Sequence, residues 1–363
     1  MKSSNFEIQK KFKIIKRGIN FFNLDLTNLV VYTELGSNDY LFTPIIASLA
    51  NAKKVYAKVI DSNFGRKDNL ISKFKKIQSL NNFPDTIEFV RDNQGLDEAD
   101  IVTNSGFVRP IDKKKIDLMK KTAVIPLMWE TWEFRPSEID FIHARNKGIL
   151  ILGTYEDFLY TNNGFLVTKL LFEQGLGVYK DNILVISSGR IGDSISNFFK
   201  NTYVKHDRIT LDKKISKKEN KFIISKKNAM KKIFSYDALI IAEHYNNADI
   251  LSNNGIFNCN KLKSENPNVK IIHICGNINL NDVMKSKLSI FPKKVAPFGF
   301  MSVGAAHLDS HAVLELNIAG LRVGEIMSRN RLRYNIKTAY KKSINHKIVN
   351  DFLGGYFNYI PKI

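Results

Sequence analysis

The sequence has 363 residues, of which 44% are hydrophobic, enough for two packed domains of ordinary size. Lys and Arg number 55 against 35 Asp and Glu, but the lysines form scattered runs without interleaved aromatics, so we expect no nucleic-acid partner and connect the charge of +20 with an anionic substrate. No segment has the length of a membrane span, the N-terminus lacks a secretion signal and the two cysteines form no C-x-x-C pair, so we expect a cytoplasmic protein without membrane partner, disulfide or bound metal.

The first half of the chain alternates strand-like and helix-like segments, a pattern typical of α/β layers around a parallel sheet. The expected helices are 40–50 and 67–80, and the expected strands are 28–34, 54–60, 86–90, 100–103, 123–127 and 148–153. The sequence therefore predicts a sheet of five or six parallel strands before residue 155.

The alternation starts again with a helix over 162–174 and a strand that runs into a glycine-containing turn. Further strands are expected at 208–211, 237–242 and 269–275, and the last two are apolar enough to be buried on both faces of a sheet. Residues that follow such strands face the ligand crevice of an open α/β sheet. We therefore assign Ala242, Glu243, Gly276 and Asn277 to a cofactor site.

The turn itself reads S-x-G-x-x-G, with Ser187 where the usual dinucleotide-binding pattern has its first glycine. Gly189 would let the backbone approach a diphosphate, and the following helix would supply N–H donors and the positive end of its dipole. We assign Ser188, Gly189, Arg190 and Ile191 to the diphosphate. The alternative is a plain strand-to-helix turn.

Asp212 follows the second strand of this half, about where an acidic residue would meet the ribose hydroxyls of NAD. Lys213 and Lys214 beside it could instead neutralise a 2'-phosphate. The cofactor is expected to be NAD, with NADP left open.

A glycine-rich loop, 297–311, carries His307, Asp309 and His311 within five positions. A histidine oriented by a carboxylate can exchange protons at neutral pH, so we expect His307 and Asp309 to be catalytic and His311 to contact substrate. The alternative is a helix N-cap flanked by surface histidines.

Three other segments follow strands of the first half and could form one pocket. Trp129–Pro136 holds both tryptophans, with Glu130 and Glu133 as further catalytic candidates and Arg135 as a two-pronged anion ligand, unless the segment is only an aromatic plug. Gly36 and Ser37 open a helix and could bind an anionic group, as could Arg109.

The order of these parts resembles the superfamily of D-2-hydroxyacid dehydrogenases and S-adenosylhomocysteine hydrolase. The segment 185–192 is similar to the dehydrogenases' V-I-G-x-G-R-I-G, 139–153 to the strand before their cofactor domain, and 270–279 and 304–313 to stretches of the hydrolase. The dehydrogenases' Arg-Glu-His triad is missing, Asn277 stands where the hydrolase has histidine, and only Lys169 resembles its catalytic lysine.

The resemblance implies two doubly wound parallel-sheet domains, a flavodoxin-like substrate domain (1–158 plus 320–363) and a Rossmann cofactor domain (159–319), with a C-terminal helix returning to the first. It implies an NAD(P)-dependent oxidoreductase, with hydride transfer to or from a small, polar, anionic hydroxy or keto substrate between the domains, and a homodimer. Two alternatives stay open: a hydrolase or lyase that uses tightly bound NAD transiently, and a non-catalytic nucleotide-binding protein.

Overall fold

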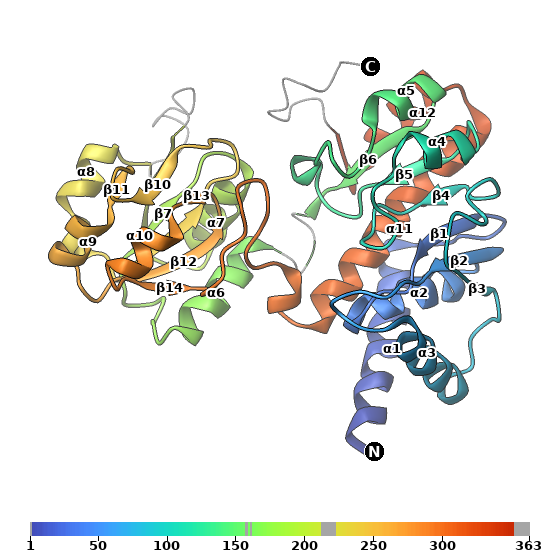
Figure 1. The fold of residues 1–363 in the computed structure, drawn as a ribbon, viewed down its shortest axis with the longest axis horizontal. Coiled ribbons are helices and arrows are strands. Elements are labelled where there is room, and N and C mark those ends of the chain that lie inside the picture. The colour runs from blue at the N-terminus through green and yellow to red at the C-terminus, as the bar shows by residue number, and fades with distance from the viewer. Residues whose placement is uncertain (1, 157–158, 160–161, 212–222, 352–363) are drawn as a thin grey trace. The chain divides into compact units, whose positions relative to one another are not determined.

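The chain folds into two α/β units, shown by a computed structural model that describes residues 2–156, 159, 162–211 and 223–351 (Figure 1). Unit 1 comprises Met1–Tyr160 and Ser310–Ile363, and unit 2 comprises Thr161–Asp309. The second boundary lies before residue 310 rather than after 319, because Ser310–Arg333 is one continuous helix, α11.

Unit 1 is built on a seven-stranded sheet in the order β15-β6-β5-β4-β1-β2-β3. Six strands are parallel, and β15 pairs antiparallel with β6. The strands are β1 (Val30–Glu34), β2 (Lys54–Lys58), β3 (Ile87–Val90), β4 (Ile101–Val102), β5 (Val124–Pro126), β6 (Leu150–Thr154) and β15 (Val349–Asn350). The run β2-β1-β4-β5-β6 is the flavodoxin-like order, and β3 extends it at one edge.

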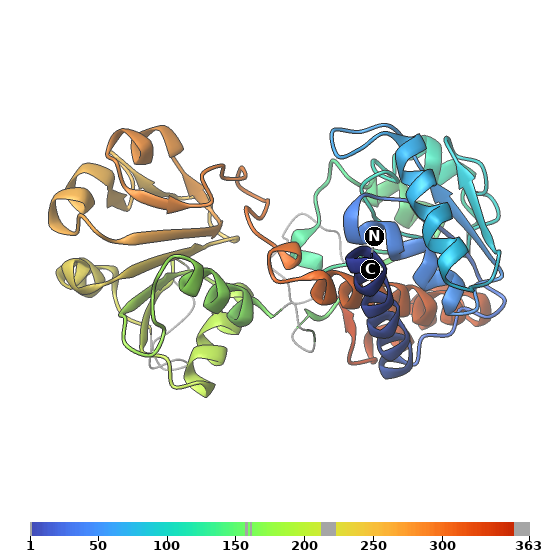
Figure 2. The ribbon, with the colours of Figure 1, turned by 90° about the horizontal axis from the view of Figure 1, so that it is seen from below.

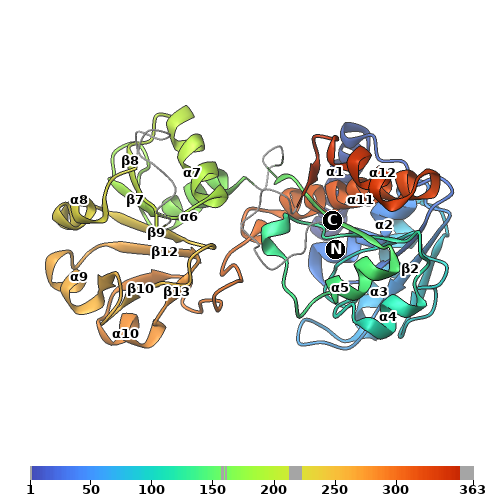
Figure 3. The same cartoon turned by 90° about the horizontal axis from the view of Figure 1, so that it is seen from above.

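Helices cover both faces of this sheet. Figure 3 shows α11 and α12 on one side and α4 and α5 on the other. The helical segments are α1 (Lys2–Phe22), η1 (Asn38–Phe42), α2 (Thr43–Leu49), α3 (Lys67–Leu80), α4 (Lys113–Leu118), η2 (Thr131–Glu133), α5 (Phe141–Lys147), α11 and α12 (Ile336–Ile344). Since α11 packs against α1 and β5, the last long helix lies in the first unit, as the sequence predicts.

Unit 2 has a five-stranded parallel sheet in the order β14-β12-β9-β7-β8. Its strands are β7 (Ile183–Ile186), β8 (His206–Ile209), β9 (Ala238–Ala242), β12 (Lys270–Cys275) and β14 (Ser289–Phe291). Ile223 adds a single parallel bridge to Arg208 beyond β8. With this bridge the order becomes that of a Rossmann sheet, which reverses between β7 and β9.

The helices of unit 2 also form two layers. Figure 2 shows α6 and α7 in green on one side of the sheet and α9 and α10 in orange on the other. The helical segments are α6 (Asn163–Glu173), α7 (Arg190–Asn201), α8 (Lys226–Lys231), η4 (Ile233–Ser235), α9 (Cys259–Glu265), α10 (Leu280–Lys285) and η5 (Ala305–His307). A small sheet joins β10 (Asp249–Ser252), β11 (Phe257–Asn258) and β13 (Asn277–Ile278).

The strand–turn–helix from β7 to α7 follows directly from its sequence. All four residues of β7 are apolar and buried, as a central parallel strand requires. Along α7, Ile191, Ile195 and Phe199 recur at every fourth position and are all buried, so one face of the helix packs on the sheet. This packing holds the N-terminus of α7 at the point where the strand order reverses.

Both cysteines are buried free thiols. Within the described ranges, no helix is apolar over a length that could cross a bilayer.

Candidate functional site

The glycine turn of unit 2 has the backbone shape that a diphosphate site needs. Gly189 has φ +78° and ψ −157° and is the N-cap of α7, so a residue with a side chain would be strained there. A methyl group built on Gly192 would lie 2.7 Å from Ser187 Cβ, so the second glycine allows helix and strand to pack closely. Ser187, in place of the first glycine, donates from Oγ to Ala242 O at 2.5 Å and thereby ties β7 to β9.

A buried arginine that the sequence analysis missed supports this turn from beneath. Arg208 on β8 is fully buried and donates to Ser187 O (2.9 Å) and Gly189 O (3.1 Å). Its Nη1 also contacts Asp193 Oδ1 at 2.6 Å. Little in the sequence signalled this role, because β8 reads His-Asp-Arg-Ile and is not an apolar strand.

The outer side of the turn is covered by side chains of the segment after β9. The ring of Tyr245 lies over Gly189, and a methyl group on that glycine would overlap Cε2 of the ring. The buried Glu243 carboxylate accepts hydrogen bonds from the N–H groups of Ser188 (2.7 Å), Tyr245 (2.9 Å) and Asn246 (3.0 Å). Burial raises the pKa of Glu243, and these hydrogen bonds oppose that rise.

The other predicted cofactor residues fall into three groups. Ile191 has a buried side chain, so only its backbone can face a ligand. Gly276 has φ +134° and its carbonyl accepts from His273 Nε2 (3.1 Å), while Asn277 Nδ2 donates to Asn247 O (3.2 Å). Asp212 lies outside the described residues, so the choice between NAD and NADP stays a prediction.

The histidine loop places His307 at the surface of unit 2. His307 is exposed in η5, and its Nδ1 accepts from Gly304 N–H at 3.3 Å. These contacts do not test the catalytic roles expected of His307 and Asp309, which stay predictions. Lys169 Nζ donates to the carbonyls of His307 and Leu308, which makes it a tie between α6 and this loop.

Unit 1 gathers a polar cluster where several of its strands end. Glu34 ends β1, Asn104 follows β4 and Glu130 follows β5, and because these strands are parallel their carboxyl ends share one edge of the sheet. Glu34 and Glu130 are buried, and Asn104 is fully buried. Glu34 accepts from Phe107 N–H (2.7 Å), and Glu130 Oε1 accepts from Glu156 N–H (3.1 Å).

Both arginines predicted as anion ligands are bound to a carboxylate that the sequence analysis missed. Arg109 Nη1 contacts Glu138 Oε1, and Arg135 Nη1 contacts the same oxygen at 3.0 Å. The Arg109 guanidinium also lies 5.1 Å from the Trp129 ring centroid. A substrate anion would have to share both arginines with Glu138, and their role as anion ligands stays a prediction.

Glu133, at the end of η2, is the titratable group of this cluster. Burial, together with the charges of Glu130 and Glu138, raises the pKa of Glu133 to about 7, while Arg135 and Arg109 oppose the rise. Burial likewise raises the pKa of Glu34 and of Tyr40. The negative charges of Glu34 and Glu133 raise the pKa of the Tyr40 phenol further. With a pKa of about 7, the Glu133 carboxyl group can give up or accept a proton near neutral pH.

Two buried polar atoms of the cluster lack a partner among the described residues. They are Asn104 Oδ1, an acceptor, and Trp129 Nε1, a donor. Asn104 Nδ2 is 3.4 Å from Glu138 Oε2, which fixes the amide with its nitrogen toward that carboxylate. Buried polar atoms are normally paired, so each of these marks a position for a ligand or water atom.

Gly36 and Ser37 form the turn between β1 and η1. A methyl group on Gly36 would lie 2.7 Å from Tyr40 Cβ and 3.2 Å from Glu34 Oε1. The absence of a side chain at 36 therefore lets Tyr40 and Glu34 come together, and the turn serves the cluster. Ser37 is the N-cap of η1 without a side-chain cap bond. His311 lies near the start of α11.

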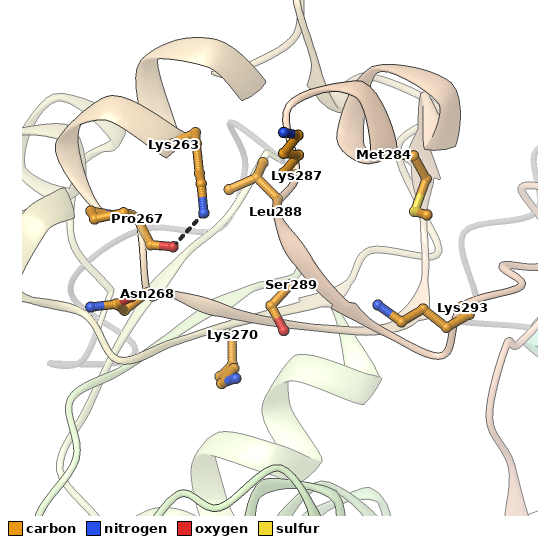
Figure 4. A pocket seen from close by; sticks show the side chains of 9 residues that line it. All are labelled: Lys263, Pro267, Asn268, Lys270, Met284, Lys287, Leu288, Ser289 and Lys293. Atoms are coloured by element: carbon orange, nitrogen blue, oxygen red, sulfur yellow. Dashed lines mark hydrogen bonds between the residues drawn. The ribbon is translucent and has the colours of Figure 1, made fainter.

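A basic hollow of about 610 Å³ lies elsewhere in unit 2 (Figure 4). Lys263, Lys270, Lys287 and Lys293 line it, and Lys263 Nζ donates to Pro267 O at 2.8 Å. Lys270 and Ser289 begin β12 and β14, so the hollow is at the amino ends of the strands. It is therefore separate from the glycine turn at their carboxyl ends.

No protein-family model and no curated protein matches the sequence. Among solved structures, a dipicolinate synthase chain from Bacillus halodurans is similar over 85% of this chain and 100% of its own, with a TM-score of 0.53 and 11% identity. A dipicolinate synthase chain from Bacillus subtilis is similar over 87% and 99%, with a TM-score of 0.52 and 14% identity.

D-lactate dehydrogenase with NAD+ from Lactobacillus jensenii aligns over 83% of this chain and 97% of its own, with a TM-score of 0.46 and 11% identity. At these identities the likeness concerns the fold. The two-domain α/β fold expected from the sequence is confirmed by its own sheets and by the dipicolinate synthase chains. Other similar solved structures are described as 2-hydroxyacid dehydrogenases.

Proposed function

We propose that the protein is an NAD(P)-dependent oxidoreductase that binds the dinucleotide in unit 2 and a small polar substrate in unit 1. The observation that carries the proposal is the glycine turn: Gly189, with φ +78°, starts α7 at the reversal of a Rossmann-ordered sheet. Dinucleotides bind at such reversals, outside the carboxyl ends of the strands.

The turn fits a diphosphate in backbone shape and in charge. The first N–H groups of α7 have no partners within the helix, and its dipole favours an anion there. Arg190 begins the helix, whereas the charge of Arg208 beneath the turn is paired with Asp193 and only supports the turn. Tyr245 is the obstacle, since its ring lies over Gly189, and binding requires that this side chain turn away.

The backbone of Gly189, Arg190 and Ile191 would hold the diphosphate, and the nicotinamide, when bound, would supply hydride chemistry. The chain's own contribution is proton exchange and positioning. Glu133, with a pKa of about 7, can hold or release a proton at its carboxyl group, and Glu138 fixes the positions of Arg109 and Arg135 around it. We therefore propose Glu133 rather than His307 as the general acid or base.

The cover over Gly189 favours one other candidate, a protein on this scaffold that binds no dinucleotide. Tyr245 and Glu243 occupy the outer side of the turn with their own ring and carboxylate. In that case Gly189 would be glycine because Tyr245 needs its space.

Calorimetric titration with NAD, NADH, NADP and NADPH separates these two functions. We expect at least one of them to bind, and Tyr245→Ala to bind it more tightly than the wild type. Tyr203→Ala is the matched control, because Tyr203 is 95% exposed and also lies in unit 2. If neither the wild type nor folded Tyr245→Ala binds any of the four nucleotides, the oxidoreductase proposal is refuted.

A further inference from the structure

We propose that the polar cluster of unit 1 binds a protonated amino group, so that the substrate is a primary amine rather than an anion. This names the substrate class of the proposed oxidoreductase and rests on that function only for the reaction, since amine binding needs residues of unit 1 alone.

The first argument is the balance of charge. The cluster holds four carboxyl groups and two guanidinium groups: Glu34, Glu130, Glu133, Glu138, Arg109 and Arg135. Both guanidinium groups contact one carboxylate, Glu138. With every group ionised, the carboxylates of the cluster would outnumber its guanidinium groups by two in a largely buried place. Such charges are costly unless protons or cations neutralise them.

The second argument is the acceptor without a partner. Asn104 is fully buried, its Nδ2 faces Glu138, and its Oδ1 has no hydrogen-bond donor among the described residues. An ammonium group offers three N–H donors and no acceptor, so it can serve this oxygen and a carboxylate together. The carboxylate group of an anion has no donor and could serve neither.

The third argument concerns access to the site. The side chain of Glu133 keeps part of its surface accessible, whereas Glu34, Glu130 and Glu138 are buried. No described residue donates a hydrogen bond to the Glu133 carboxyl group. Tyr40 is the remaining titratable group facing it, and a phenol brings no positive charge. Glu133 is therefore the carboxyl group that an incoming ammonium can reach.

Trp129 adds a requirement on the rest of the substrate. Its Nε1–H is buried and has no acceptor among the described residues, while Arg109 stands over its ring. An oxygen on the substrate would satisfy this donor. The favoured class is thus an amine that also carries an oxygen acceptor, such as an amino acid or amino alcohol.

Binding should release a proton. Below its pKa, Glu133 is a neutral acid, and an ammonium ion beside it favours the carboxylate. The balance is R–NH3+ plus Glu133–COOH giving the ion pair plus one H+ in solvent. The uptake of that proton by the buffer makes the heat of binding depend on the buffer.

The experiment uses the full chain without dinucleotide, in phosphate and in HEPES, since Tris is itself a primary amine. Ligands are methylammonium, both enantiomers of alanine, both enantiomers of lactate and Mg²⁺. We expect methylammonium and one alanine to bind with buffer-dependent heat at neutral pH, and lactate to bind more weakly than alanine. Glu133→Gln should weaken methylammonium about tenfold, the effect of losing one charged hydrogen bond, and abolish the buffer dependence.

The matched control is Glu88→Gln, on β3 of the same unit, where Glu88 pairs with Lys54 at 2.9 Å on the surface. It should bind like the wild type. The proposal is overturned if lactate binds as well as alanine, if Mg²⁺ binds in place of the amines, if no amine binds, or if wild-type binding releases no proton. Proton release is measured on the wild type, so this test does not depend on whether a variant folds. Because dinucleotide is absent, failure here leaves nucleotide binding by unit 2 untouched.

Discussion

Replacing Glu133 by Gln should change how stability depends on pH. The pKa of Glu133 is about 7 in the folded protein against an ordinary 4.5. Between these values the folded state keeps a proton that the unfolded chain has lost, so stability falls as pH rises. The stabilising contribution is complete below the unfolded pKa and is lost as pH passes the folded pKa.

The size of the effect follows from the same two values. From about pH 5 to about pH 8 the Glu133 contribution should fall by about 2.5 kcal/mol. For a unit of this size that corresponds to roughly 5–10 °C in Tm. Glutamine keeps the shape and carries no titrating proton, so Glu133→Gln should be the more stable protein at the alkaline end.

The assay is thermal or urea unfolding of both proteins across this pH range, in a buffer free of primary amines. The quantity to compare is the difference between wild type and variant, because other groups titrate too. Burial lowers the pKa of His206 and of His273, which makes stability rise with pH in both proteins alike. The reasoning would be refuted if the difference in stability stayed constant across the pH range. It would also be refuted if the wild type were the more stable protein at the alkaline end.

Three further changes test other parts of the structure. Arg208→Met should destabilise unit 2 by about 3–5 kcal/mol in urea unfolding, because two buried carbonyls and Asp193 lose their donor; an unchanged midpoint would contradict this. Gly189→Ala should lower the free energy of unfolding by about 1–3 kcal/mol, because alanine is strained in this backbone conformation. Adding Tyr245→Ala removes the ring overlap but should leave most of that loss, which separates backbone strain from overlap. Asp112→Ala should cost about 1 kcal/mol in unfolding experiments by removing the cap that accepts from Lys115 N–H, whereas Asp112→Asn should cost less.

Much of the fold could be predicted because the relevant signals are local. The strand at 238–242 is an apolar run, those at 54–58 and 87–90 keep an apolar majority, and the helix at 67–80 matches the predicted range. Their parallel pairing followed from the alternation of strand and helix. The glycine turn was also predictable, because Gly189 takes a conformation that few other residues adopt.

The candidate site was predicted less well, because its contacts join distant parts of the chain. Glu133 and Arg135 were named from one short segment. The position of Arg135, and of Arg109 from another segment, depends on ion pairs with Glu138. Tyr245 lies over Gly189 from the segment after β9, 56 positions further on, and no local pattern indicates such a contact. The histidine loop was named only because His307 and Asp309 are close in sequence, and their roles stay predictions.

The position of unit 2 within the sequence has a practical consequence. The chain passes from unit 1 to unit 2 near residue 160 and passes back near residue 310, so two separate peptide connections tether the units. A protease that cuts one of these connections leaves both halves covalently joined through the other. Any hinge motion has to bend both connections at once, which restricts the directions it can take.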